Sequence, residues 1–193
     1  VRQTDVAGNV SQATSFTFTY DTEAAAPTVA LATDTGSSST DKVTNVGTLA
    51  VTGTETGATV EYSTDGSSWS TTAPALAQGS NTVQVRQTDV AGNVSQATSF
   101  TFSYDTEAAA PTVALATDSG SSSTDKVTNV GTLNVTGTET GATVEYSADG
   151  SHWSISAPAP DEGSNTVYAR QTDAAGNTSQ ASSFTFTYDT TAP

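Results

Sequence analysis

Residues 81–104 read NTVQVRQTDVAGNVSQATSFTFSY, and this stretch decides the fold class. Val83 and Val85 alternate with polar residues, as do Phe100 and Phe102 further along. An apolar residue at every second position indicates a β-strand with one buried face. The Ala-Gly-Asn between the two segments is typical of a turn. The stretch therefore predicts two neighbouring strands joined by a short loop.

The same alternation recurs upstream, and no segment has a helical period of useful length. Asp65-Gly66 adds a tight hairpin signal. Six or seven short strands within one repeat predict an all-β class, with immunoglobulin-like β-sandwich domains. The predicted strands are Thr28–Ala32, Thr48–Thr52, Thr59–Thr64, Asn81–Thr88 and Ser99–Tyr104.

The chain repeats itself: residues 23–106 align without a gap with 107–190, and only fifteen aligned positions differ. A period of 84 residues exceeds the roughly 20–50 residues of solenoid repeats and fits a small domain. We therefore expect two tandem domains in an extended rod. Residues 1–22 are interpreted as the C-terminal hairpin of a preceding repeat, and 191–193 as the start of the next linker.

Composition excludes several classes of function. The 193 residues include 5 Lys+Arg and 20 Asp+Glu, a net charge of −15. This charge disfavours nucleic acids and anionic membranes, and no apolar run approaches the ~20 residues that span a bilayer. Without cysteine and with one histidine, His152, thiolate and multi-histidine chemistry is excluded.

We expect that the chain is not an enzyme. A glycoside hydrolase with paired carboxylates is the alternative, but the acidic residues recur with the domains and none is set apart as a catalytic base.

The acidic residues are predicted to gather where domains meet. In a sandwich, the loop 34–45 and the exit linker of one domain face the next domain's counterparts of loops 53–58 and 89–93. Oxygen ligands without His or Cys favour Ca²⁺, which takes six to eight oxygens in flexible geometry. The candidate metal ligands are Asp21, Glu23, Asp34, Asp41, Asn45, Glu55, Asp89, Asn93, Asp105, Glu107, Asp118, Asp125, Glu139, Asp173, Asn177 and Asp189.

Each signal has a simpler structural interpretation. Thr-Asp-x-Ala-Gly-Asn can be a turn in which Asp and Asn cap backbone N–H groups. Asp65 and Asp149 are interpreted as hairpin-turn residues, and Glu61 and Glu145 as solvated strand residues. His152 replaces a serine of the other repeat, which argues against a repeated role.

Four motifs in this order resemble the bacterial Ig-like tandem repeats in the extender regions of large RTX-type and biofilm-associated adhesins. They are Asp-x-Gly-Ser-Ser-Ser-Thr-Asp-Lys-Val-Thr-Asn, Val-Glu-Tyr-Ser-x-Asp-Gly-Ser-x-Trp, Arg-Gln-Thr-Asp-x-Ala-Gly-Asn-x-Ser-Gln and Phe-Thr-Phe-x-Tyr-Asp-Thr. The resemblance implies an extracellular protein of a Gram-negative cell surface, exported by type I secretion. It also implies that calcium at domain junctions stiffens the chain.

The function expected is mechanical: each domain is a spacer, and the array projects a distal ligand-binding domain from the cell. The alternative is a directly adhesive module that binds glycan, ice or another cell through outward threonines such as Thr17 and Thr19. We expect a monomer whose partners are the neighbouring repeats of its own chain.

Overall fold

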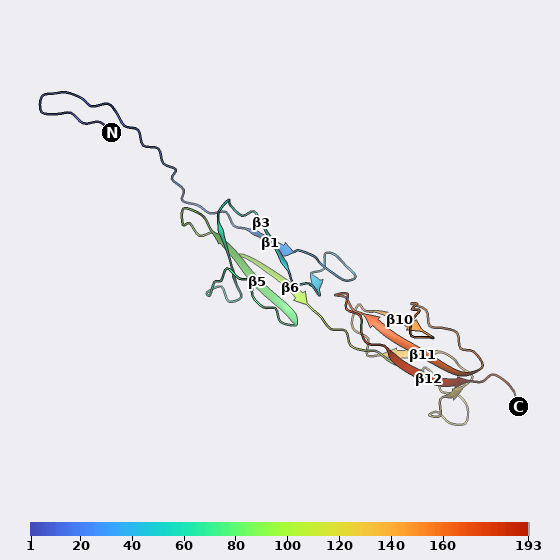
Figure 1. Cartoon of the computed structure of the whole chain (residues 1–193). Coiled ribbons are helices and arrows are strands. Elements are labelled where there is room, and N and C mark those ends of the chain that lie inside the picture. The colour runs from blue at the N-terminus through green and yellow to red at the C-terminus, as the bar shows by residue number, and fades with distance from the viewer. Residues whose placement is uncertain (193) are drawn as a thin grey trace.

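The computed structural model describes residues 1–192, and it folds as two β-sandwich domains that lie end to end (Figure 1). Of the predicted linker start 191–193, Pro193 lies outside the described residues. No helix is present among residues 1–192, so the all-β expectation is confirmed. The first domain contains β1 (Thr28–Leu31), β2 (Val43–Thr44), β3 (Leu49–Thr52), β4 (Thr59–Ser63), β5 (Gly79–Thr88) and β6 (Thr98–Tyr104). The second contains β7 (Thr112–Leu115), β8 (Val127–Thr128), β9 (Leu133–Thr136), β10 (Thr143–Ser147), β11 (Gly163–Thr172) and β12 (Ser182–Tyr188).

Each domain is built from a two-stranded and a four-stranded sheet. In the first domain β1 pairs with β3, and the larger sheet has the order β2-β6-β5-β4. The second domain repeats this as β7-β9 and β10-β11-β12-β8. The five predicted strands correspond to β1, β3, β4, β5 and β6, with ends shifted by up to two residues. β2 was not predicted from the sequence. It has only two residues, which pair in parallel with β6, and so short a strand shows no alternation of apolar and polar residues.

The core of each domain lies between its sheets and is small. In the first domain it consists of Val29, Val83, Val85 and Phe102. Along β5 buried and less buried residues alternate, as the sequence predicts. On the outer face, the hydroxyls of Thr82 and Thr101 lie 2.8 Å apart. These outward threonines therefore form a cross-strand pair that stabilises the sheet.

Residues 1–22 form no named strand and extend away from the first domain (Figure 1). A single bridge pairs Thr4 with Val10. Phe18 is 71% exposed, whereas its counterpart Phe102 is 2% exposed in the complete domain. Phe16 is 83% exposed, whereas its counterpart Phe100 is partly buried. The segment thus has the sequence of a repeat's last strands without a packed sheet beside it.

Among the described residues there is no helix with the length and apolarity that a membrane crossing requires.

The small core predicts a large effect for a small cavity. Val83 is 1% exposed, so Val83→Ala should lower the free energy of unfolding by about 2 kcal/mol, measured by urea denaturation. Val90→Ala is the matched control, because Val90 is 78% exposed and should change stability little. Equal effects of the two substitutions would contradict the assigned core.

Candidate junction site

A buried glutamine organises the end of each domain that faces the preceding one. Gln171, near the end of β11, is 0% exposed. Its Oε1 accepts a hydrogen bond from the Glu139 amide at 2.9 Å, and its Nε2 donates to the Ala109 carbonyl at 2.6 Å. One side chain thereby ties the entering linker and the β9–β10 loop to β11.

Gln87 repeats this arrangement in the first domain. It bonds the Glu55 amide at 2.9 Å and the Ala25 carbonyl at 2.6 Å. Neither glutamine was predicted from the sequence to have a structural role. A glutamine at a position where the β5 alternation predicts an inward side chain was the signal that could have revealed them.

The linker and the two loops bring three carboxylates together at the junction. Asp105 follows β6 of the first domain, Glu139 lies in the β9–β10 loop, and Asp173 follows β11. One oxygen of each lies within 4.8 Å of the others. Glu139 is further fixed because its Oε1 accepts a hydrogen bond from the Ala109 amide at 2.6 Å.

The same cluster occurs 84 residues earlier, at the entrance to the first domain. There Asp21, Glu55 and Asp89 place one carboxylate oxygen each within 4.8 Å of the others. Glu55 Oε1 accepts a hydrogen bond from the Ala25 amide at 2.7 Å. The arrangement is therefore a property of the repeat.

Asn177 connects the cluster to the upstream domain. Its Nδ2 donates to Asp173 Oδ2 and to the Asp105 carbonyl, both at 2.8 Å. Its Oδ1 accepts from Asn45 Nδ2 at 3.1 Å. The Asn177 backbone amide also donates to Asp173 Oδ1 at 2.8 Å, so the turn-capping interpretation is confirmed for the aspartate. The asparagine side chain caps no backbone N–H within residues 1–192 and instead bonds Asp173, Asp105 and Asn45. A carboxylate accepts up to about four bonds, so capping leaves Asp173 able to bind a cation.

Asp34 and Asp41 lie in the β1–β2 loop and are not part of the three-carboxylate cluster. Asp34 Oδ2 accepts a hydrogen bond from the Lys42 amide at 2.9 Å, and Asp41 Oδ1 accepts from the Val43 amide at 3.0 Å. Asp34 Oδ1, however, is buried and has no hydrogen-bond partner within residues 1–192. A buried oxygen of this kind has open coordination capacity.

The second repeat has the same loop. Asp118 Oδ2 accepts from the Lys126 amide at 2.9 Å, and Asp125 Oδ1 from the Val127 amide at 3.1 Å. Asp118 Oδ1 also lacks a partner in the part of the chain that the structure describes.

The remaining candidates lie beside the clusters. Glu23 and Glu107 are exposed, and their backbone amides donate to Asp21 Oδ1 at 3.3 Å and Asp105 Oδ1 at 3.2 Å. Asp189, the counterpart of Asp105, accepts from the Thr191 amide at 3.0 Å.

Asn93 bonds Asp89 as Asn177 bonds Asp173. The hydrogen bond from the Asn93 side chain lowers the pKa of Asp89, so this carboxylate is ionised at neutral pH.

The chemistry of the cluster matches a hard divalent cation. Ionised carboxylates this close repel one another in a partly desolvated junction. Ca²⁺ is bound by carboxylate and carbonyl oxygens and tolerates irregular geometry, whereas zinc and copper favour nitrogen or sulfur. The residues that could bind such an ion are Asp105, Glu139 and Asp173, and their counterparts at the first entrance.

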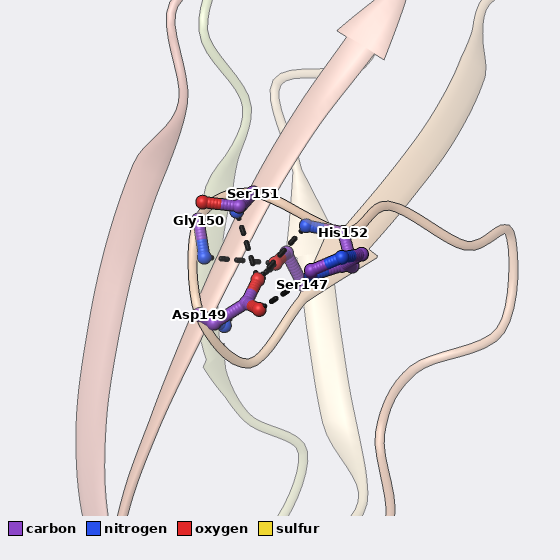
Figure 2. Close-up of polar contacts among 5 residues, drawn as sticks. All are labelled: Ser147, Asp149, Gly150, Ser151 and His152. Carbon is purple, nitrogen blue, oxygen red and sulfur yellow. Dashed lines mark hydrogen bonds and ion pairs between the residues drawn. The ribbon is translucent and has the colours of Figure 1, made fainter.

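The lone histidine, His152, belongs to neither cluster. It lies in the turn that follows β10 (Figure 2). Asp149 Oδ1 accepts hydrogen bonds from the Ser151 and His152 amides, both at 2.8 Å. His152 Nδ1 lies 2.7 Å from Asp149 Oδ2. These bonds confirm Asp149 as a turn residue and hold its pKa well below its usual range. The neighbouring Asp149 carboxylate raises the pKa of His152.

The structure is thus a modular array of two Ig-like sandwiches in tandem, and each has a cluster of three carboxylates where the chain enters the domain. The chain belongs to the bacterial Ig-like domain family, whose model matches residues 23–106 and 107–190. A comparison with curated proteins finds no significant match.

Removal of the organising glutamine should loosen the junction and the domain together. Gln171→Ala leaves the Glu139 amide and the Ala109 carbonyl unpaired, and should lower the free energy of unfolding of the second domain by about 2 kcal/mol or more. Urea denaturation checks this, with Gln180→Ala as control because Gln180 is exposed. If both variants unfold at the same urea concentration, Gln171 does not have this role.

The raised pKa of His152 predicts that the stability of its turn depends on pH. Because its folded pKa lies above the ordinary 6.5, its pairing with Asp149 stabilises the turn at pH values below 6.5 and is lost as pH rises through the folded pKa. An NMR titration of the His152 ring should give a raised midpoint, which Asp149→Asn should return toward 6.5. Asp65→Asn, in the other domain, should leave the midpoint unchanged.

Proposed function

We propose that the chain is an extender segment of a bacterial surface adhesin, stiffened by Ca²⁺ at its domain junctions. The support is the end-to-end arrangement of two nearly identical domains (Figure 1). Membership of the bacterial Ig-like family adds to it, because such domains typically occur in surface or extracellular proteins. Type I secretion, a role in biofilms and a distal ligand-binding domain belong to the same proposal.

The observation that carries the proposal is that both domains contribute carboxylates to one cluster. Asp105 follows the last strand of the first domain, whereas Glu139 and Asp173 belong to the second. Without a cation, their mutual repulsion favours separation of the linker from the loops. A bound Ca²⁺ would reverse the sign of this interaction and connect the linker to the downstream domain.

Asp34 Oδ1, which is buried and has no partner among residues 1–192, supports a cation in the same region, although this loop is separate from the cluster. This oxygen has given up water without gaining a donor, which costs about 1–3 kcal/mol unless another partner satisfies it. A second ion near Asp34 would provide that partner.

The mechanical consequence follows from geometry. β5 and β11 contain ten residues each, and at ~3.3 Å per residue such strands give a domain about 33 Å long. Length therefore grows with the number of repeats. Extracellular modules bind Ca²⁺ with dissociation constants of roughly 10⁻⁴–10⁻³ M, so the junctions would stiffen after export into a calcium-rich medium.

Calcium should also stabilise the fold. An ion that binds only the folded protein adds about 2.7 kcal/mol at a hundredfold excess over its dissociation constant. We expect the melting temperature to rise with Ca²⁺ and to respond far less to equimolar Mg²⁺, which demands stricter octahedral geometry. Calorimetry with each ion and with a chelator measures this, and equal shifts with both ions would contradict a calcium site.

The cluster itself is tested by a substitution that keeps the hydrogen bond and removes the charge. Glu139→Gln can still accept from the Ala109 amide, so it should weaken calcium binding tenfold or more in isothermal titration, while stability in chelator should not fall. Asp161→Asn is the control, because Asp161 is exposed in the same domain, outside the cluster. If Glu139→Gln binds calcium as tightly as Asp161→Asn, the ion does not bind at this cluster.

A further inference from the structure

The two domains also touch directly, through groups other than the clustered carboxylates. Thr35 Oγ1 donates to the Ala175 carbonyl at 2.9 Å, and the Ser37 amide donates to the Ala174 carbonyl at 3.2 Å. Together with the bond from Asn45 to Asn177, these contacts join the β1–β2 loop and the residue after β2 to the loop after β11. The contacts are mostly to backbone atoms.

A comparison of equivalent residues in the two repeats shows which of them are buried by the neighbouring domain. Ala175 is 1% exposed, whereas its counterpart Ala91 is exposed. Asn45 is partly buried, whereas Asn129, the same residue in the second repeat, is exposed. Since the loops have nearly the same sequence, the difference arises from the adjoining domain.

Gly36 lies where the backbones of the two domains come close together. Its φ is +100°, and a Cβ built there would overlap the carbonyl group of Ala174. A Cβ on Gly176 would in turn lie 3.1 Å from the Cα of Gly36. Only small residues on both sides allow this approach of two backbones.

Gly120 is the same glycine in the second repeat, and no domain within residues 1–192 adjoins it. Its φ is +106°, and a Cβ there would meet only the Val127 carbonyl, at 3.9 Å. Alanine at either glycine therefore imposes the same local backbone strain. Only at Gly36 does it also collide with a second domain.

We propose that residues 35–37, with Asn45, form a docking surface for the Ala-Gly-Asn loop of the following repeat, and that this surface sets the angle between domains. The partner is a loop of small residues that offers two backbone carbonyls and an asparagine amide. The second repeat presents the same surface at residues 119–121 and Asn129, where it would accept the Ala-Gly-Asn loop of a further repeat. Docking does not use the carboxylate cluster, so it goes beyond the proposed role of calcium.

Asn177 couples the two interactions, because it bonds Asn45 of the docking surface and Asp173 of the cluster. Docking thus positions a group that also holds a cluster carboxylate. By linkage, a ligand that favours one interaction favours the other.

The test is a distance measurement between the domains by double electron–electron resonance. The sequence has no cysteine, so Ser67→Cys and Ser151→Cys, both on exposed turns, place one spin label on each domain. Gly36→Ala should shift or broaden the distance distribution relative to the unsubstituted protein, both in calcium and in chelator. Gly120→Ala should leave the distribution unchanged.

If the distributions of Gly36→Ala and Gly120→Ala superimpose in both conditions, the docking surface does not set the angle and the inference is wrong. If they differ but neither responds to calcium, the docking surface stands and the calcium proposal fails. The two hypotheses are therefore tested separately.

A second pair of variants covers the case in which Gly36→Ala does not fold. Asn45→Ala removes the bond to Asn177, and Asn129→Ala makes the same change where no domain adjoins. In both asparagines Oδ1 lies beside a hydroxyl of the same domain, 2.8 Å from Thr35 Oγ1 and 2.7 Å from Ser119 Oγ. Only Asn45→Ala should broaden the distribution, and equal distributions for the two would overturn the inference.

Discussion

The buried glutamine near the end of the longest strand is the constraint on which the junction depends. Gln171 bonds the linker carbonyl of Ala109 and the loop amide of Glu139 from inside the domain. Because a buried amide group left unpaired is costly, these partners have little freedom to move apart. The linker therefore enters each domain along a fixed path, and the carboxylates of Asp105, Glu139 and Asp173 are held close together despite their like charges.

Two interactions of different character meet at that junction. The carboxylates of the cluster repel one another. Under the proposed function a bound cation would reverse this effect, so the contribution of the cluster would depend on the medium. The backbone docking around Gly36 is short-ranged and steric, so its contribution depends on the identity of the residues. Under the two proposals, the chain would specify the angle between its domains by sequence and regulate its stiffness by ion concentration. Copying one repeat along the chain copies both properties.

The fold was largely predictable because half-buried strands alternate, as Val83 and Val85 do. β2 was not, since a two-residue strand in parallel pairing has no pattern of its own. The strand topology was enough to predict that acidic residues lie at the junction. It could not show that Asp105 belongs to the cluster and Asp34 does not, because that depends on loop conformation. Gln171 and Gly36 were missed for a related reason: polar residues and glycines in loop-rich sequences have many structural roles, and only the three-dimensional contacts distinguish them.

The most direct test of the calcium-stiffened spacer is a crystal structure of residues 23–190 grown in calcium. A calcium-stiffened junction should contain an ion bound by Asp105, Glu139 and Asp173 with oxygen distances of about 2.3–2.6 Å. Every copy should contain this ion and have the same interdomain angle. Carboxylates turned outward around water alone, with angles that differ from copy to copy, would contradict it.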